Sequence, residues 1–285
     1  MLYLIAKPLK GKKAKLIPEI ERRLQERNVA YELHFTASKE DGAVLAANFS
    51  AEKGNTVVVI GGDGTVNNVL SGLNVENAAF GIIPAGTGND FADTAKIPLG
   101  LPALDLILNS EPKDTDFLQF SDGRRSLNVA GIGIDVDVLA RCERMKHFRA
   151  KSKYFISLLK SLLTYRGCNM KIACGEFSAE GNFLLAAFCN GKVFGGGIPI
   201  CPDAEIDDGK MNLIYAECPP RRKIPAALIK LMHGKILSLP FAHQITCTKA
   251  ELMPEAPFFA QCDGELFEAT SFSAEIVSGL KLFRG

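Results

Sequence analysis

The chain has 285 residues, of which 47% are hydrophobic and 23% are charged. These proportions are those of a folded globular protein, and the length allows one large domain or two smaller ones. The 33 Lys and Arg residues nearly balance the 32 Asp and Glu residues, which leaves a formal net charge of +1. This balance argues against a nucleic-acid-binding protein, so any anion site must be local. No apolar run is long enough to span a membrane or to form a signal peptide, so we expect a cytoplasmic protein.

Strand and helix patterns alternate over the first 115 residues. Apolar strand patterns occur at 2–6, 31–37, 56–60 and 79–84. Helical patterns lie between and after these strands, at about 16–24, 43–49 and 101–108 and directly after the glycines that follow residue 60. This alternation predicts a parallel sheet that is covered by helices on both faces.

Short strand patterns dominate from about residue 116 onward, separated by Gly, Asn, Asp and Pro. Two helical stretches, at about 135–165 and 221–238, interrupt them. All eight cysteines lie in this part of the chain, without a CxxC pair, and we expect reduced, buried thiols there. The change in pattern predicts two domains, an α/β domain over 1–116 and a β-rich domain over 117–271.

A glycine-rich loop follows the most strand-like stretch of the chain, in VVVIGGDGTVNNVL (57–70). In a parallel α/β sheet, ligands bind at the carboxyl ends of strands, where the next helix presents backbone N–H groups and the positive end of its dipole. Glycines allow the backbone to approach a phosphate group closely. Asp63 would repel that phosphate unless a cation such as Mg²⁺ bridges the two. The alternative is a glycine turn in which Asp63 caps a helix.

A second strand of the same domain ends in a similar loop, in AAFGIIPAGTGNDFA (78–92). The polar and glycine residues 86–90 follow an apolar run and precede a short predicted helix. We expect the two loops to be neighbours and to form one anion site. Neither loop matches the phosphate-loop pattern GxxxxGK[ST] or the dinucleotide pattern GxGxxG, which argues against both of those site types.

The pair GGDGT (61–65) and PAGTGND (84–90) resembles the catalytic domain of the diacylglycerol kinase family, which includes bacterial diacylglycerol kinases and related lipid kinases. Two later stretches, 190–212 and 261–268, also fit this family. GGDG is shared with NAD kinases, and the second loop favours the lipid kinases. The resemblance implies an NAD kinase/diacylglycerol kinase-like α/β domain with a parallel sheet, followed by a C-terminal β-rich sandwich domain, with 272–285 returning to the first domain. It also implies transfer of the γ-phosphate of ATP to a lipid hydroxyl.

Carried over by position, the resemblance implies the residues of the site. The nucleotide-binding set comprises Gly61, Gly62, Asp63, Gly64, Thr65, Asn67, Gly86, Thr87, Asn89, Asp90 and Lys7. Lys7 stands where the family usually has Asn, so the choice of ATP over another nucleotide is left open. The catalytic set comprises Glu265, Asp116 and Asp63. Glu265 is implied as the base that accepts the proton of the lipid hydroxyl, with Asp116 assisting. The alternative for Glu265 is an acid in a DG hairpin turn.

Acidic residues cluster in CPDAEIDDGKMN (201–212) and offer the oxygen ligands that hard cations prefer. A solvated acidic loop is the alternative interpretation. The resemblance implies a structural Mg²⁺ held by the Asp208 carboxylate and by the main-chain carbonyls of Glu205 and Lys210. A further Mg²⁺ is expected at Asp63, together with the nucleotide. ATP and Mg²⁺ are therefore the expected cofactors.

A basic half is followed by an apolar half in the stretch 141–166. Such a stretch suits docking to the inner face of the membrane, where a lipid substrate resides. The alternative is a core helix with a solvated basic face.

Three functions stay open from the sequence. The leading one is an ATP-dependent lipid kinase of phospholipid biosynthesis that acts on diacylglycerol or a related lipid at the membrane surface. The second is an NAD kinase-like enzyme that phosphorylates a soluble nucleotide, and the third is a non-catalytic nucleotide-binding module. A homodimer is among the oligomeric states that the sequence leaves open.

Overall fold

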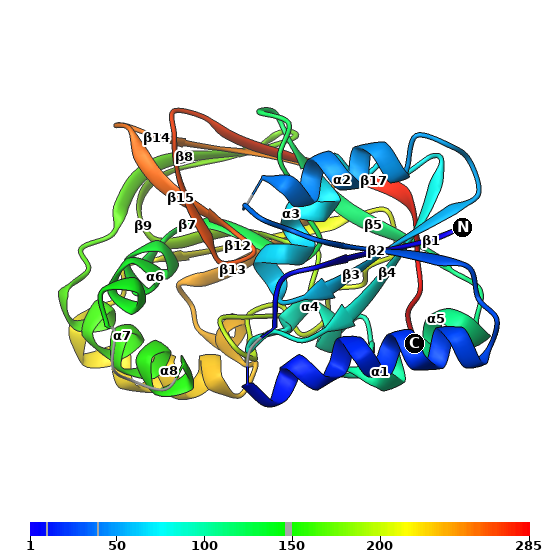
Figure 1. Ribbon diagram of the computed structural model, residues 1–285. Coiled ribbons are helices and arrows are strands. Elements are labelled where there is room, and N and C mark those ends of the chain that lie inside the picture. The colour runs from blue at the N-terminus through cyan, green and yellow to red at the C-terminus, as the bar shows by residue number, and fades with distance from the viewer. Residues whose placement is uncertain (10, 39, 146–149) are drawn as a thin grey trace. The chain divides into compact units, whose positions relative to one another are not determined.

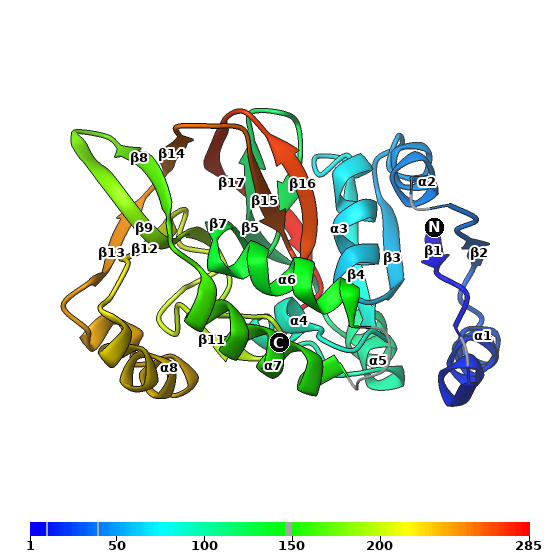
Figure 2. The same ribbon diagram turned by 90° about the vertical axis from the view of Figure 1, so that its left-hand side faces the viewer.

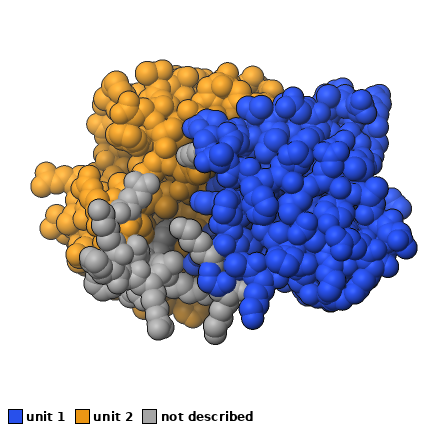
Figure 3. Space-filling view, in the orientation of Figure 1, with its two compact units in different colours: residues 1–116, 278–285 blue, residues 117–277 orange. Residues whose placement is uncertain are grey.

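The computed structural model describes residues 1–9, 11–38, 40–145 and 150–285 (Figure 1). These residues form two compact units, one of residues 1–116 with 278–285 and the other of residues 117–277 (Figure 3). The first unit is α/β with parallel strands and the second is β-rich, so the fold class predicted from the sequence is confirmed.

The first unit alternates strands and helices. Its strands are β1 (Leu2–Ala6), β2 (Tyr31–Phe35), β3 (Asn55–Gly61) and β4 (Ala78–Pro84). Its helices are η1 (Gly11–Lys15), α1 (Leu16–Glu26), α2 (Asp41–Phe49), α3 (Asp63–Gly72), α4 (Asp90–Thr94) and α5 (Leu101–Asn109). The strands pair in parallel in the order β4-β3-β1-β2.

Helices cover both faces of this sheet, as the alternating pattern predicted. Helices α2 and α3 pack together on one face and α1 and α5 pack together on the other (Figures 1 and 2). Strand β3 is buried from Val57 to Gly61 because both of its faces meet helices. Since all strands run the same way, their carboxyl ends lie at one edge of the sheet, where the loops after β3 and β4 begin.

The second unit consists mainly of antiparallel strands. They are β5 (Lys113–Phe120), β6 (Arg125–Ser126), β7 (Val129–Gly133), β8 (Cys168–Cys174), β9 (Phe177–Cys189), β10 (Val193–Phe194), β11 (Ile198–Pro199), β12 (Met211–Glu217), β13 (Ala242–Cys247), β14 (Lys249–Pro254), β15 (Phe258–Cys262), β16 (Glu265–Ala269) and β17 (Phe272–Leu282). The main order is β16-β15-β7-β9-β8-β14-β17, and β12 pairs with β9 and β13.

The end strands β5 and β17 each have residues in both units. The first half of β17 pairs with β14, from Phe272 to Glu275, within the second unit. Its last part returns to the first unit, where Leu282 pairs in parallel with Phe80 of β4. The sequence-based assignment gave all of 272–285 to the first domain, whereas this pairing keeps residues 272–277 with the second unit.

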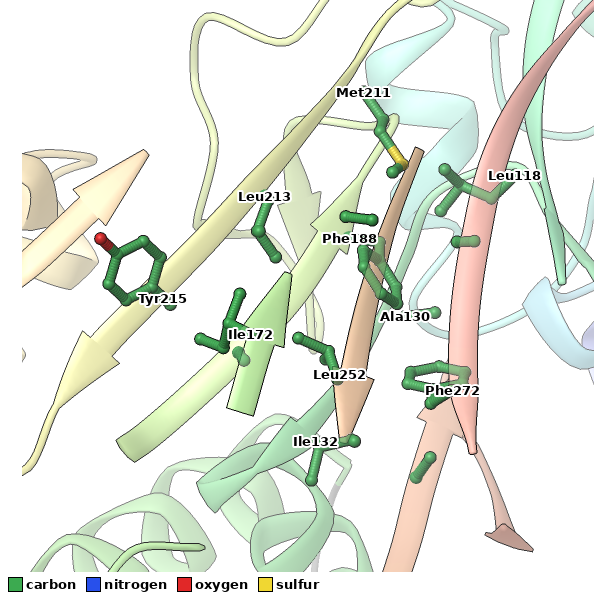
Figure 4. Packing of buried hydrophobic residues seen from close by; sticks show 14 of the residues in the cluster. Leu118, Ala130, Ile132, Ile172, Phe188, Met211, Leu213, Tyr215, Leu252 and Phe272 are labelled. Atoms are coloured by element: carbon green, nitrogen blue, oxygen red, sulfur yellow. The ribbon is translucent and has the colours of Figure 1, made fainter. Parts of the chain in front are cut away.

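The strands of the second unit enclose one apolar core (Figure 4). Phe188 of β9 and Phe272 of β17 are fully buried at its centre, and Phe272 stacks on Phe120 with ring centroids 5.0 Å apart. Leu213 of β12 and Leu252 of β14 belong to the same cluster. Burial of these large side chains between strands is the main stabilising contribution to such a sandwich.

Helices cover the other face of these strands. They are α6 (Ile134–Arg144), α7 (Ala150–Thr164) and α8 (Ile224–Met232), with the short helices η2 (Arg221–Lys223) and η3 (Ile236–Ser238). The stretch 135–165, expected to be helical, is thus divided into α6 and α7, and residues 146–149 lie outside the described residues. Within the described ranges, no helix has the length and hydropathy needed to cross a membrane.

The eight cysteines are all free thiols in the structure. The expectation that they are buried holds for Cys174, Cys189, Cys201 and Cys262. It is wrong for Cys218, which is exposed after the end of β12.

Candidate active site

The first glycine loop joins β3 to α3. Strand β3 ends at Gly61 and α3 begins at Asp63, and Gly62 stands between them in an extended conformation. Thr65 and Asn67 lie in the first two turns of α3. The start of this helix therefore directs backbone N–H groups and its dipole toward the carboxyl edge of the sheet, the arrangement that favours an anion.

The second glycine loop joins β4 to the short helix α4. Strand β4 ends at Pro84 and α4 begins at Asp90. Asn89 has a left-handed backbone (φ 59°), which Asn tolerates better than most residues. Its Oδ1 atom accepts a hydrogen bond from the Gly86 N–H group at 2.9 Å, so Asn89 closes the loop on itself and leaves Thr87 exposed.

The two loops are in contact, which confirms that they are neighbours. Strands β3 and β4 pair along their whole length, and the Ala85 N–H group donates to the Gly61 carbonyl at 2.7 Å. A Cβ atom added to Gly62 would lie 2.8 Å from Gly86 Cα, and one added to Gly86 would lie 2.4 Å from Gly62 Cα. Both distances are far below a van der Waals contact, so the two backbones can meet only because both residues are glycine.

Asp63 connects the two loops through its carboxylate. Its Oδ2 atom accepts the Asn89 N–H group at 2.8 Å, and its Oδ1 atom accepts the Asp90 N–H group at 3.1 Å. These are the amides that begin α4, so Asp63 at the start of one helix caps the next one. Two N–H groups and a helix N-terminus thus stabilise the Asp63 carboxylate. The Mg²⁺ expected at Asp63 from the sequence stays a prediction.

Two lysines lie at the same edge of the sheet. Lys13, in η1, donates from Nζ to the carbonyls of Ala85 at 2.7 Å and Gly86 at 2.6 Å. Lys7 follows β1, and its backbone N–H group donates to the Ile60 carbonyl at 3.3 Å, while its side chain is exposed. The contact of Lys13 with the second loop could not be foreseen from the sequence, because only the fold brings residues 13 and 86 together.

In the second unit, the candidate base Glu265 follows a tight hairpin turn. Asp263 (φ 49°) and Gly264 (φ 86°) join β15 to β16, and Glu265 pairs with Cys262 across the hairpin. Two successive residues with positive φ are typical of a type I′ turn, for which Asp-Gly is a preferred sequence. Glu265 is half-buried as the first residue of β16. The hairpin geometry expected for CDGE is confirmed, and the catalytic role of Glu265 stays a prediction.

Asp263 anchors this turn, a role that the sequence argument missed. Its Oδ1 atom accepts hydrogen bonds from the Ser126 hydroxyl at 2.6 Å and the Val129 N–H group at 3.1 Å. Its Oδ2 atom accepts the Leu127 N–H group at 3.3 Å, and its own N–H group donates to the Val129 carbonyl at 3.1 Å. Three donors on one carboxylate fix the turn, and hence the backbone position of Glu265, to the start of β7.

Asp135 adds a buried carboxyl group near the same turn. It lies in the first turn of α6, with 3% of its surface exposed, and burial raises its pKa to about 6. Gly131 of β7 leaves space for it, since a Cβ atom there would be 3.1 Å from Asp135 Oδ2. Gln261, which pairs with Gly131, is also buried, and its Oε1 atom accepts the Gly264 N–H group at 3.0 Å. A buried polar pair of this kind has no periodic signature in a sequence.

Asp116 belongs to the first unit and lies in β5, where 2% of it is exposed. Its neighbour Thr115 accepts a hydrogen bond from Arg284 Nε at 3.0 Å, and Arg284 Nη2 donates to the Asp114 carbonyl at 3.0 Å. The C-terminal residues thus hold the start of β5. Asp116 is thus a buried carboxylate next to this anchored segment, and its assisting role stays a prediction.

The acidic segment before β12 is only partly as expected. Ala204 and Ile206 are buried, whereas Asp203, Glu205, Asp207 and Asp208 are exposed. Asp208 Oδ1 accepts the Lys210 N–H group at 2.9 Å. In the described part of the chain, no three His, Cys, Asp or Glu side chains gather in a way that could hold a metal ion. The segment therefore does not form a multi-carboxylate site, and a site that uses Asp208 with main-chain carbonyls stays a prediction.

Comparisons with known proteins agree with this architecture. The family model of the diacylglycerol kinase catalytic domain matches residues 1–120, and that of the YegS C-terminal NAD kinase beta sandwich-like domain matches residues 128–282. A "Probable lipid kinase YegS-like" of Yersinia enterocolitica is 28% identical over 90% of this chain and 87% of its own length. The "Diacylglycerol kinase" of Mycobacterium tuberculosis is 30% identical over 80% of this chain and 75% of its own length.

Solved structures show the same fold. A crystal structure from Bacillus anthracis str. Sterne, of a protein named for diacylglycerol kinase, covers 100% of this chain with a TM-score of 0.81 at 22% identity. It is itself covered to 97%. These matches define the class of the protein as a lipid kinase with an α/β domain and a β-sandwich domain. The chain belongs to the diacylglycerol kinase catalytic-domain family.

Proposed function

We propose that this member of the lipid kinase family transfers the γ-phosphate of ATP to the hydroxyl group of diacylglycerol or a related lipid. The observation that carries the proposal is the contact between the two glycine loops, Gly62 against Gly86, with the Asp63 carboxylate joining them. Two loops so close together offer several backbone N–H groups to one polyphosphate. The names of the relatives from Yersinia and Mycobacterium support a lipid acceptor and, for the second, diacylglycerol.

The first unit would bind the nucleotide. The loop residues 61–65 and 86–90 would hold the phosphate groups, with Asn67 beside them. Lys7 and Lys13 carry positive charge at the same edge of the sheet and would offset part of the phosphate charge. When bound, Mg²⁺ would neutralise phosphate charge. Asp63 would hold it through the lone pairs that remain on its two oxygens, since each oxygen accepts one N–H group.

The second unit would supply the base. In this proposal, Glu265 accepts the proton of the lipid hydroxyl as the new P–O bond forms and the bond to the β-phosphate oxygen breaks, which releases ADP. Asp263 and Gln261 hold the turn that carries Glu265. Asp116 would assist as a second carboxylate.

A structural Mg²⁺ in the second unit would be held by the Asp208 carboxylate and by the main-chain carbonyls of Glu205 and Lys210. The proximity of Asp208 Oδ1 to the Lys210 backbone supports this grouping. The exposed acidic side chains around it add negative potential that favours a cation.

We also propose that the enzyme works at the inner face of the membrane, as part of phospholipid biosynthesis, because a diacylglycerol substrate resides in the bilayer. The stretch 141–166 would contribute to this contact through exposed residues of α7, although residues 146–149 lie outside the described residues.

The test is a phosphoryl-transfer assay with radiolabelled ATP, Mg²⁺ and mixed micelles. The acceptors are diacylglycerol, phosphatidylglycerol, a sphingoid base, a polyprenol and NAD. We expect label on a lipid, with diacylglycerol as the first candidate. Label on NAD alone would instead establish an NAD kinase-like enzyme. ATP binding without any labelled acceptor would establish a non-catalytic nucleotide-binding module.

A further inference from the structure

The segment that contains η2 and α8 has an unusual charge pattern. From Cys218 to Ala250 the chain contains no Asp or Glu, although it carries Arg221, Arg222, Lys223, Lys230, Lys235 and Lys249. The whole protein has a formal charge of only +1, so this segment concentrates positive charge that is balanced elsewhere. Arg221, Arg222, Lys223 and Lys235 are exposed. Lys230 donates from Nζ to the Ser238 hydroxyl at 2.5 Å. Because this hydroxyl is neutral, the contact does not offset the positive charge of Lys230.

Helix α8 also exposes large apolar side chains. Ile224 and Ala227 are buried, whereas Ile229 is 60% exposed and Met232 is 43% exposed. Residues three positions apart lie on the same face of a helix, so Ile229 and Met232 form one outward apolar pair. A soluble surface helix would normally place polar residues at such positions.

Helix α7 repeats this arrangement. The inner sides of α7 and α8 belong to one apolar cluster, which includes Leu158 and Leu162 from α7 and Ile224 from α8. Both helices lie along the same edge of the second unit in the two ribbon views (Figures 1 and 2). On its outward side, α7 exposes Leu159 (44%) and Leu163 (57%). Since both helices cover the same sheet face, their exposed apolar residues point away from the sheet.

We propose that the outward side of η2 and α8, together with Leu159 and Leu163 of α7, is a docking surface for an anionic phospholipid bilayer. Exposed basic groups are attracted to anionic headgroups, and apolar side chains beside them insert at the boundary of the acyl chains. The inference rests on the proposed function in one respect: a lipid substrate is the reason for the enzyme to bind a bilayer.

Other partners fit this surface less well. Single-stranded nucleic acids are held by exposed aromatic side chains beside basic groups, and Phe241, the only aromatic residue other than histidine between Cys218 and Ala250, is buried. A second copy of the chain would bring like charges into opposition across a twofold interface, which is unfavourable. Of a bilayer, a single-stranded nucleic acid and a second copy of the chain, only the anionic bilayer is complementary to both the positive charge and the exposed aliphatic side chains.

The test is co-sedimentation of the full chain with vesicles of phosphatidylcholine, or of phosphatidylcholine and phosphatidylglycerol in equal parts. Wild-type protein should bind the mixed vesicles and not the neutral ones. The double variant Ile229→Ser, Met232→Ser should lose binding by about tenfold or more. The triple variant Arg221→Gln, Arg222→Gln, Lys223→Gln should bind more weakly by a similar factor and show a smaller dependence on salt.

The matched control is Val44→Ser, which removes an equally exposed apolar side chain (61%) from α2 in the first unit. This variant should bind vesicles like the wild type. Circular dichroism should show all variants folded. Phosphorylation of a short-chain, water-soluble diacylglycerol should be unchanged in the double and triple variants, because the surface is needed for the bilayer and not for the reaction.

Several results would overturn the inference. One is vesicle binding by the double and triple variants equal to that of the wild type, and another is loss of binding in Val44→Ser to the same degree. The others are displacement of the protein from vesicles by single-stranded RNA at low concentration and a dimer that the double and the triple variant both dissociate. Absence of lipid phosphorylation by the wild type would refute the proposed function, and vesicle binding would still be measured independently.

Discussion

The bracing of the two glycine loops by Asp63 can be tested by the nearly isosteric change Asp63→Asn. In the wild type, the two carboxylate oxygens accept the N–H groups of Asn89 and Asp90 at 2.8 and 3.1 Å. An Asn side chain keeps one acceptor oxygen and presents an NH₂ group where the second oxygen stood. One hydrogen bond is therefore lost, and two donors face each other at the start of α4.

The magnitude follows from these two bonds. A hydrogen bond to a charged group contributes about 1.5–3 kcal/mol, and an unsatisfied donor adds a further penalty where it is buried. Because Asp63 is half-buried and water can solvate part of the site, we expect the free energy of unfolding to fall by about 2 kcal/mol. With a typical urea dependence, this lowers the midpoint of the first unit by about 1 M urea.

The assay is urea unfolding followed by circular dichroism, in buffer that contains EDTA and no nucleotide. The stability loss should appear under these conditions, because the bracing uses only backbone N–H groups. The control is Asp93→Asn, an exposed carboxylate of α4, which should change the free energy of unfolding by less than about 0.5 kcal/mol. Equal stability of Asp63→Asn and wild type without Mg²⁺ would refute the bracing and return Asp63 to a purely metal-binding role.

Further predictions concern the base, the loop contact and the buried carboxyl group. Glu265→Gln should abolish lipid-dependent ATP turnover at unchanged stability, whereas Glu268→Gln in the same strand should not, and near-normal turnover in the first variant would exclude Glu265 as the base. Gly86→Ala should cost about 1–3 kcal/mol of stability and weaken ATP binding, since its Cβ atom would lie 2.4 Å from Gly62 Cα; the same change at Gly181, where the nearest atoms are 3.9 Å away, is the control. For Asp135, burial raises the pKa from 3.8 to about 6, so the folded state binds the proton more tightly than the unfolded state. The tighter proton binding by folded Asp135 contributes fully to the free energy of unfolding below pH 3.8. This contribution, about 3 kcal/mol, is lost as the pH rises through 6. Asp135→Asn should remove this pH dependence from the unfolding free energy, and identical pH profiles of variant and wild type would contradict the assignment.

Much of the fold could be predicted from the sequence because its signals are local. The spacing of apolar residues indicates the alternation of strands and helices up to residue 115. This alternation predicted the parallel sheet of β1 to β4. The two glycine loops were found for the same reason, since each directly follows a buried strand. The Asp-Gly turn before Glu265 could also be predicted. Few residue types adopt a positive φ, and Asp-Gly is a preferred pair for two such positions.

Contacts between distant residues could not be predicted in this way. Lys13 touches Gly86, and Asp263 binds the backbone at Leu127 and Val129, but nothing in the local pattern of either residue marks its partner. The outward face of α8 has no local signature for a related reason. Helical periodicity alone does not distinguish buried Ile224 from exposed Ile229.

The class of fold and the two glycine loops could be predicted because both depend on residues that are close along the chain, and the candidate base came from the family resemblance. The hydrogen-bond partners of Asp63, by contrast, depend on the tertiary structure. The Asp63 carboxylate accepts amides that lie 26 and 27 residues away along the chain. The pairing of β3 with β4 brings these amides to the Asp63 carboxylate, and that pairing exists only in the folded sheet.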